Sequence, residues 1–208
     1  MDANSVWDVI APRKDAQEPT SQSKLIVATS PRVELMLVAA MFAAPTPSPA
    51  HYGTLDHPIA RAARAWFAPF VDHPVVDTVR RLFYVEEVPF PGFACDAVTS
   101  FVLCRGNPPD LAARYPHSDS ALARADGDST VLDLLVEQLG DFYHLSHFAS
   151  FWEEQTSAYR CIEEQVANHV ATGWAGEDVI ATMESYFGEE RTAYVLVPTP
   201  MERPGGAR

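Results

Sequence analysis

Short apolar runs near both ends of the chain have the character of strands. Residues Lys24–Thr29 and Thr192–Pro198 are rich in Val, Ile and Leu and are bounded by polar residues or proline, a pattern typical of strands. Because the backbone groups of a buried strand need partners, these runs predict a small sheet of two or three strands. A strand that follows a long helical block also suggests that part of the architecture is absent.

Hydrophobic residues recur at helical spacing between these runs. Ser30 is a good N-cap, with Pro31 at the first position of a mostly buried helix that continues to Ala44 and ends at Pro45. A second helix is expected over residues 56–70. Its apolar stripe consists of Ile59, Ala62, Ala63, Trp66, Phe67 and Phe70.

Three further segments follow. Asp72 is the expected N-cap of a third helix, whose inward residues are Val75, Val79, Leu82 and Phe83. Phe93–Cys104 is apolar enough for another buried helix, whereas Gly106–Asp128, rich in Pro, Asp, Ser and Ala, predicts a long loop. A short helix is expected over Glu177–Phe187.

The strongest helical pattern is a series of large apolar side chains spaced three, four or seven residues apart. The series consists of Phe142, Leu145, Phe148, Trp152, Tyr159, Ile162, Val166 and Val170. It predicts an aromatic seam along one face of either one long helix or two helices with a break near Gly140.

These elements together predict an α+β fold that is predominantly helical, with about six or more helices and a two- or three-stranded sheet. The 208 residues suffice for one domain with a hydrophobic core. We expect that domain over residues 24–200, leaving open that it is incomplete at its C-terminal end, with flexible tails over residues 1–23 and 201–208.

The composition narrows the classes of partner. Apolar residues make up 47% and charged residues 21%, which is typical of globular proteins, and the net charge of -13 without a Lys/Arg cluster argues against nucleic acid. The longest apolar stretch, Val33–Ala44, contains Glu34 and is too short to span a membrane. The N-terminus lacks the features of a signal peptide, so we expect a cytoplasmic protein.

Cysteines do not indicate a metal or redox site. Cys95, Cys104 and Cys161 are odd in number and widely spaced, without a CxxC motif. We expect them to be small buried residues in a reducing compartment.

Two histidines are candidates for binding a metal. His144 and His147 are three residues apart, with Asp141 one turn before His144, so a continuous helix would place both imidazoles on one face. Glu154 is two turns from His147, too far to share an ion. Hydrogen-bonded packing is the favoured interpretation, with a metal site as the alternative.

An acidic segment resembles a calcium loop in part. Asp126, Asp128, Thr130 and Glu137 match ligand positions, but Val131 stands where the turn requires glycine. Asp128 or Ser129 as the N-cap of a helix explains the same residues better.

No catalytic motif is present in the sequence. The adjacent acids Glu153-Glu154, Glu163-Glu164 and Glu189-Glu190 are interpreted as solvated helix faces. The chain contains no GxSxG elbow, P-loop, dinucleotide fingerprint or HExxH motif. The sequence therefore assigns no catalytic residue, no cofactor-binding residue, no metal ligand and no cofactor.

Several segments, taken in order, resemble a family of largely uncharacterised bacterial proteins, a domain of unknown function with zincin-like metallopeptidase character. These segments are Pro31–Leu35, Trp66-Phe67 followed by Asp72–Val76, Phe148–Trp152 with Tyr159, and Tyr194–Pro198 with Gly205-Gly206. The resemblance covers nearly all of residues 24–206 and rests on packing and capping patterns.

The resemblance implies that relatives continue into another strand and a helix with an HExxH motif, where two histidines bind zinc and the glutamate acts as general base. No residue here matches those positions. The chain would then be the N-terminal, mainly helical part of such a domain, in which the strand near Tyr194 begins the sheet with Leu25–Ala28. A truncated reading frame, a degenerate relative and half of a split protein are the alternatives.

Two functional hypotheses follow. The first is a metallopeptidase-like domain that is catalytically incompetent alone because the zinc motif is absent. The second is a non-catalytic helical protein that binds an unknown protein, peptide or small ligand through the aromatic seam or the Gly106–Asp128 loop. In either case an exposed final strand would allow self-association.

Overall fold

The computed structural model describes residues 25–43, 57–83, 91–116, 118–173, 185 and 194–199. Backbone contacts divide the chain into two compact units, one of residues 1–30 and 156–198 and the other of residues 31–155 and 199–208. We call them unit 1 and unit 2. The two expected tails lie outside the described residues, and so does the helix expected over 177–187 except for residue 185, which is helical. The single domain over 24–200 stays a prediction.

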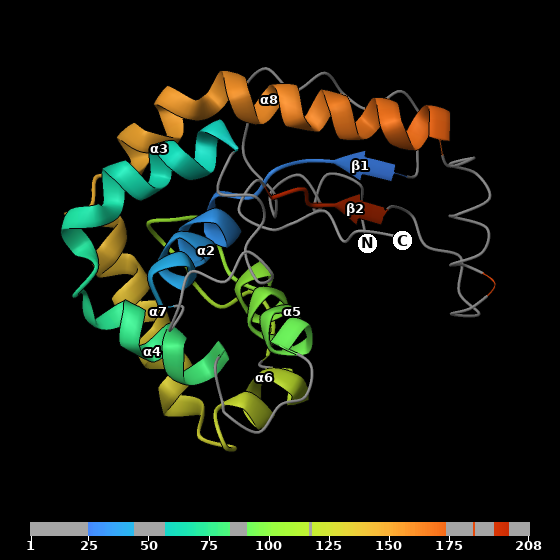
Figure 1. Cartoon of the computed structure of the whole chain (residues 1–208). Coiled ribbons are helices and arrows are strands. Elements are labelled where there is room, and N and C mark those ends of the chain that lie inside the picture. Colours follow the sequence, from blue (N-terminus) through green and yellow to red (C-terminus); the bar gives the residue numbers. More distant parts are fainter. Residues whose placement is uncertain are drawn as a thin grey trace. The chain divides into compact units, whose positions relative to one another are not determined.

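Unit 1 contains a small parallel sheet. Strands β1 (Leu25–Val27) and β2 (Tyr194–Leu196) lie side by side and pair in parallel, with Ile26 opposite Val195 (Figure 1). The backbone N–H of Ala28 extends the pairing by donating to the carbonyl of Leu196 at 3.0 Å. The small sheet predicted from the two apolar runs is therefore confirmed.

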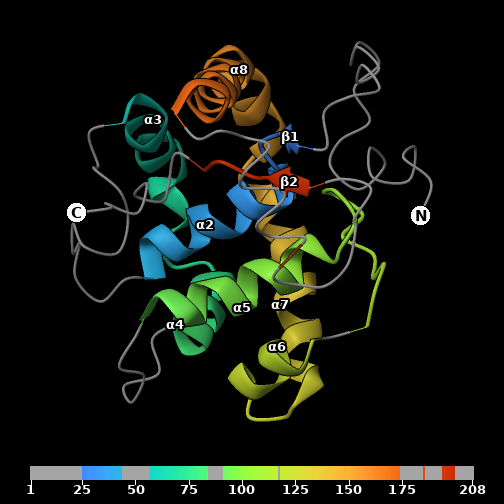
Figure 2. The ribbon, with the colours of Figure 1, turned by 90° about the vertical axis from the view of Figure 1, so that its right-hand side faces the viewer.

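Unit 2 is built around the buried helix α2 (Pro31–Ala43), which contacts α3 (Pro58–Phe67), α4 (Pro74–Phe83), α5 (Pro91–Leu103) and α7 (Ser129–Leu145) (Figures 1 and 2). Eleven of the thirteen residues of α2 are buried. A helix that is apolar nearly all round is stable only when other elements bury it, and these four helices of unit 2 contact it. The predicted α2 begins at Pro31 as expected.

The helices that cover α2 also follow the sequence pattern. Helix α3 buries Ile59, Ala63 and Phe67 and continues into the 3-10 helix η1 (Ala68–Phe70). All four inward residues expected for the next helix are buried on α4. On α5, Phe101 and Val102 are buried.

The long loop expected over Gly106–Asp128 contains a short helix, so that prediction is wrong in part. Helix α6 (Asp119–Arg124) begins after Ser118, whose hydroxyl oxygen accepts a hydrogen bond from the N–H of Ala121 at 3.2 Å. The Pro, Asp and Ser content concealed a serine N-cap followed by only six helical residues. An isolated bridge between Arg105 and Ala113 holds the first part of the segment.

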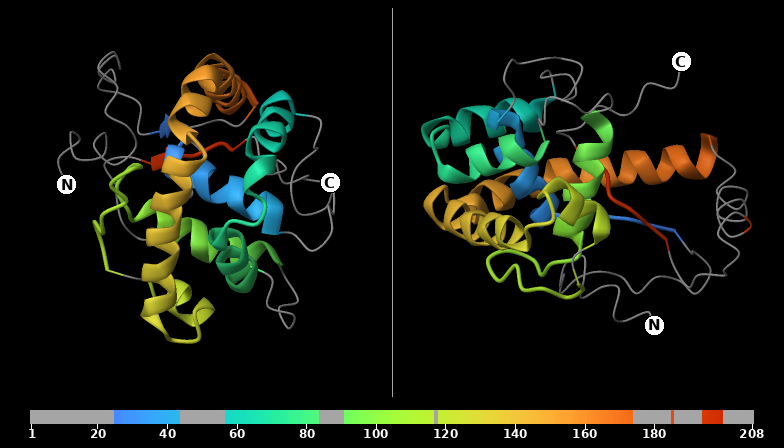
Figure 3. Two further views of the ribbon diagram at one scale, coloured as in Figure 1. Left: turned by 90° about the vertical axis from the view of Figure 1, so that its left-hand side faces the viewer. Right: turned by 90° about the horizontal axis from the view of Figure 1, so that it is seen from below.

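The break in the long aromatic series lies at Ser146-His147 and not near Gly140. Gly140 is inside α7, and α8 (Phe148–Gly173) starts after His147, whose φ is 54°. The first turns of α8 run in a different direction from α7 (Figure 3, left). A glycine within a helix costs only about 1 kcal/mol relative to alanine, which the packing of α7 offsets.

The fold class is α+β and predominantly helical, as predicted. Seven α-helices and one two-stranded sheet are seen among the residues that the structure describes. Within the same residues, no helix combines the length and the hydropathy needed to cross a membrane.

Candidate functional site

Buried charges at the start of α2 form the most unusual polar region of unit 2. Arg32 and Glu34 have exposed fractions of 0% and 1%, and Arg105, just after α5, is also buried. The Nη1 group of Arg32 donates a hydrogen bond to the backbone carbonyl of Arg105. A guanidinium at this place satisfies a carbonyl at the negative end of α5.

The electrostatics keep this region cationic at neutral pH. Burial lowers the pKa of Arg32 to about 10, and the nearby charge of Arg114 acts in the same direction. Burial likewise lowers the pKa of Arg105, while Asp133 opposes that change. The guanidinium of Arg105 lies 4.4 Å from the ring centroid of Phe101, a cation–π contact. Arg32 therefore acts as a fixed positive anchor and not as a proton donor near pH 7.

Sequence reasoning missed these charges. Arg32 and Glu34 occur in the segment that carries the resemblance, but their helix was interpreted from its apolar residues. The available signal was the presence of two charged residues in a run otherwise hydrophobic on every face, because such charges must be buried together with the helix.

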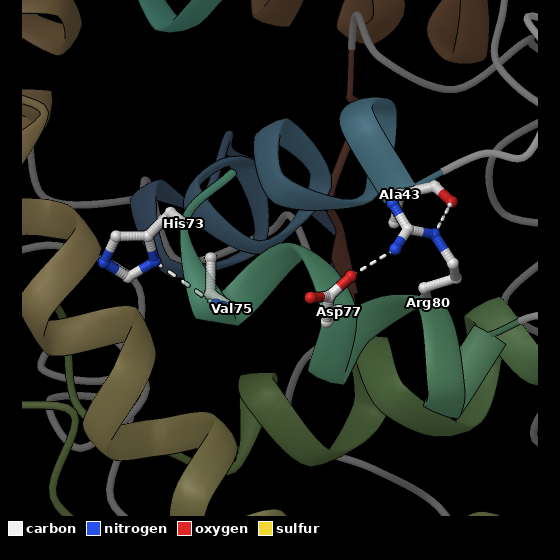
Figure 4. Close-up of polar contacts among 5 residues, drawn as sticks. All are labelled: Ala43, His73, Val75, Asp77 and Arg80. Atoms are coloured by element: carbon white, nitrogen blue, oxygen red, sulfur yellow. Dashed lines mark hydrogen bonds and ion pairs between the residues drawn. The ribbon is translucent and has the colours of Figure 1, made fainter. Parts of the chain in front are cut away.

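Two histidines serve as N-caps. The Nδ1 atom of His57 accepts a hydrogen bond from the N–H of Ile59 at 3.3 Å, and Nδ1 of His73 accepts from the N–H of Val75 at 3.2 Å (Figure 4). Asp72, the expected cap of α4, is exposed. The cap is one residue later because the imidazole of His73 reaches the free N–H group from the position directly before Pro74.

The aromatic residues form a packed cluster centred on Phe67. Its ring centroid lies 4.9 Å from that of Phe151 in an edge-on arrangement, 5.8 Å from that of Phe142 and 6.0 Å from that of Phe148. Trp66 adds a hydrogen bond from Nε1 to the carbonyl of Ser146 at 2.9 Å. These contacts join α3 to the turn between α7 and α8, so this part of the expected seam is core packing.

The seam is not continuous along one face. Phe142, Phe148 and Tyr159 are buried, but Leu145 is 56% exposed. Leu145 ends α7 directly before the turn, where the change of direction removes it from the face that Phe142 occupies. The prediction that it faces inward is wrong.

His144 and His147 do not share a helix face. His144 lies in the last turn of α7 and His147 in the turn after it, with both side chains exposed. Within the described ranges, no group of three or more His, Cys, Asp or Glu side chains is arranged to hold a metal ion. Because the helix ends between the two histidines, the helical spacing that suggested a metal pair does not apply to them.

Asp128 has the capping role expected for it. Its carboxylate accepts hydrogen bonds from the N–H of Thr130 at 2.9 Å and from the hydroxyl of Thr130 at 2.6 Å. These hydrogen bonds from Thr130, that of the hydroxyl above all, lower the pKa of Asp128. The preference for an N-cap over a calcium loop is thus consistent with the geometry, in which Glu137 lies exposed on α7.

One of the paired acids makes a specific contact. In unit 1, the Oε1 atom of Glu163 accepts hydrogen bonds from both the backbone N–H and the hydroxyl of Thr29, each at 2.7 Å. Thr29 follows β1 and is buried. The solvated face expected for this pair applies to Glu164, which is exposed, and not to Glu163.

Two of the cysteines are less buried than expected, and the side chain of Cys95 lies outside the described residues. Cys161 is exposed and Cys104 is half-buried, and both are free thiols. Cys161 lies on a helix that is exposed over much of its C-terminal part, so the general burial of cysteine did not apply there.

No protein-family model, no curated protein and no solved structure matches this chain.

Proposed function

We propose that this chain is a metallopeptidase-like domain that is catalytically incompetent by itself. The basis is the resemblance of its ordered segments to the zincin-like family. The observation that carries the proposal is that these segments occur at structurally defined points: Pro31 begins α2, Pro74 begins α4 and Phe148 begins α8. The last of them, Tyr194–Pro198, includes β2, which pairs with β1 as the resemblance implies.

Catalytic incompetence follows from the chemistry that a zincin needs. Three protein ligands hold the zinc and a glutamate activates the bound water. The sequence has no HExxH motif, and the structure, over its described ranges, has no substitute cluster. Peptide cleavage would require these groups from another segment.

The first test measures zinc and cleavage together. The purified 208-residue chain is incubated with zinc, desalted and analysed for metal, and cleavage of labelled unfolded casein is measured. We expect neither stoichiometric zinc nor cleavage, and zinc-dependent cleavage would overturn the proposal. If zinc is retained, His144→Ala tests the exposed pair, with His169→Ala on α8 as the matched control.

A second test addresses the family itself. The coding sequence beyond the codon for Arg208 is read in all three frames. A strand followed by an HExxH helix there would support the metallopeptidase-like assignment. A downstream sequence without such a motif would count against it and favour a non-catalytic protein.

The second candidate function is non-catalytic self-association through β2. Val195 and Leu196 are 38% and 40% exposed, although parallel sheets are normally buried on both faces. The segment Thr192–Pro198 carries no charge, so two copies could align there despite the net charge of -13 elsewhere. A two-fold antiparallel pairing of β2 with β2 of a second copy would extend the sheet.

Mass in solution over a range of concentrations tests this candidate. The short strand predicts a weak dimer that dissociates on dilution. Val195→Lys should abolish it, because lysine on an edge strand opposes pairing. Leu145→Lys, at an exposed apolar position in unit 2, should leave it intact. A wild-type monomer at every concentration would exclude the candidate, and loss of dimer in both variants would indicate nonspecific apolar contact.

A further inference from the structure

Helices α3 and α4 begin with the same local sequence. Each is preceded by Asp-His and starts with proline and a β-branched residue, Asp56–Ile59 in one case and Asp72–Val75 in the other. In both, the imidazole Nδ1 accepts the hydrogen bond of the backbone N–H two residues later. The usual capping side chains are Ser, Thr, Asp and Asn, none of which changes its capping ability near neutral pH.

A histidine cap differs because only the neutral imidazole has an acceptor nitrogen. Protonation turns Nδ1 into a donor, which would then face the N–H of Ile59 or Val75 at the present distances of 3.3 and 3.2 Å. The added positive charge also lies at the positive end of the helix dipole. One proton therefore removes a favourable hydrogen bond and adds two repulsive contacts.

We propose that His57 and His73 form a pair of acid-sensitive caps, which hold the starts of α3 and α4 at neutral pH and release both when the imidazoles are protonated. The inference does not depend on either proposed function. The result of release is the loosening of two helices that contact α2, one of which carries Phe67 at the centre of the aromatic cluster.

The surroundings of the two imidazoles favour the neutral form. Burial lowers the pKa of His57, and the charge of Arg61 one turn later on α3 lowers it further. Burial also lowers the pKa of His73, while Asp141 on α7 opposes that change. The ring of His73 lies 5.3 Å from that of Phe142. Asp77, in the first turn of α4, pairs with Arg80 (Figure 4).

The sign of the pH dependence follows from these directions. A histidine whose pKa is lower in the folded chain than in the unfolded chain is bound to more protons when unfolded. Stability is therefore complete above the unfolded pKa of about 6.5 and decreases as the pH falls toward the folded pKa. Between its folded and unfolded pKa, each such histidine changes the unfolding equilibrium constant by at most about tenfold per pH unit. Two such histidines together give at most about a hundredfold per pH unit.

Urea unfolding between about pH 8 and about pH 5 tests the proposal. The double variant His57→Asn and His73→Asn keeps a capping acceptor but cannot titrate in this range. Between these two pH values the unfolding equilibrium constant of each protein changes by some factor. We expect this factor to be at least about tenfold smaller for the double variant than for the wild type. The control pair His144→Asn and His169→Asn, at exposed positions, should retain the wild-type slope.

Nitrogen NMR of the imidazoles gives a test on the unmodified chain. At about pH 8 both rings should show an unprotonated Nδ1, as a cap requires. Both should titrate at a lower pH than an ordinary histidine, whose pKa is about 6.5. A protonated Nδ1 at that pH would overturn the proposal, as would an equal slope in the double variant and the wild type.

Discussion

Individual side chains satisfy helix ends throughout unit 2. Arg32 donates to the carbonyl of Arg105 after α5, and Arg80 donates through Nε to the carbonyl of Ala43 at the end of α2, 3.0 Å away (Figure 4). Because the last carbonyls of a helix have no intrahelical partner, an arginine from another helix both fills this need and fixes the relation of the two helices. At these ends, capping is a tertiary contact.

Replacement of Arg32 tests the strength of such a contact. Arg32→Met keeps the apolar stem but removes the buried hydrogen bond to the carbonyl of Arg105. We expect a loss of about 1–3 kcal/mol in the free energy of unfolding, because a buried carbonyl loses its partner. The measurement is urea unfolding by circular dichroism. Arg64→Met, at an exposed position of α3, should change the free energy of unfolding by no more than about 0.5 kcal/mol. Equal effects of the two substitutions would refute a special role for Arg32.

The pKa of Arg32 sets the pH range over which this residue contributes to stability. Since the pKa of Arg32 is lowered to about 10, the folded chain holds this proton less firmly than the unfolded chain does. Stability linked to Arg32 is constant at neutral pH and increases only as the pH rises toward and beyond 10. The difference between wild type and Arg32→Met should therefore be the same at about pH 6 and about pH 8.

At the scale of elements, the sequence predicted most helices but not all of their junctions. Prolines and apolar stripes gave α2, α3, α4 and α5 because proline has a fixed place at helix starts and breaks helices elsewhere. The turn at Ser146-His147 was missed because Leu145 and Phe148 are three residues apart, a spacing that a continuous helix also produces. The buried Arg32 and its tertiary partner lie beyond what local periodicity can show.

The core of α3 is the next test. Phe67 is buried and contacts three other phenylalanine rings, so Phe67→Ala should leave a cavity and cost about 3–5 kcal/mol. Val71→Ala, just beyond η1 and 44% exposed, should be nearly neutral. Thermal and urea unfolding of both variants give the comparison, and a small effect of Phe67→Ala would mean that the cluster collapses to fill the space.

The start of α7 makes a pH-dependent prediction. Hydrogen bonds from Thr130 lower the pKa of Asp128, so its contribution to stability is present above the unfolded pKa of about 3.9 and is lost as the pH falls through the folded pKa. Asp128→Ala should lower the urea midpoint at about pH 7 and have less effect at about pH 3. Glu137→Ala, on an exposed position of the same helix, should not show this pattern.

At the scale of the whole molecule, the two units differ in how they are built. In unit 2, α2 is buried almost throughout, so its amides should open only when that unit unfolds. In unit 1, the described sheet has two short strands, and sheets of this size are only marginally stable alone. The contact of Thr29 with Glu163 adds a tie between the end of β1 and α8 within this unit.

Hydrogen exchange distinguishes the two units. The amide of Ala28, which bonds to Leu196, should exchange at least about 100-fold faster than that of Leu37 in α2, after correction for intrinsic rates. Glu163→Gln should accelerate exchange at Ala28 and Thr29 further, because a neutral amide accepts the two hydrogen bonds from Thr29 less strongly. It should leave Leu37 unchanged, and Glu164→Gln, at the exposed neighbouring position, should affect neither. Equal exchange rates in β1 and α2 would instead mean that the chain opens as one cooperative body, and the small sheet would then owe its stability to more than its own strands.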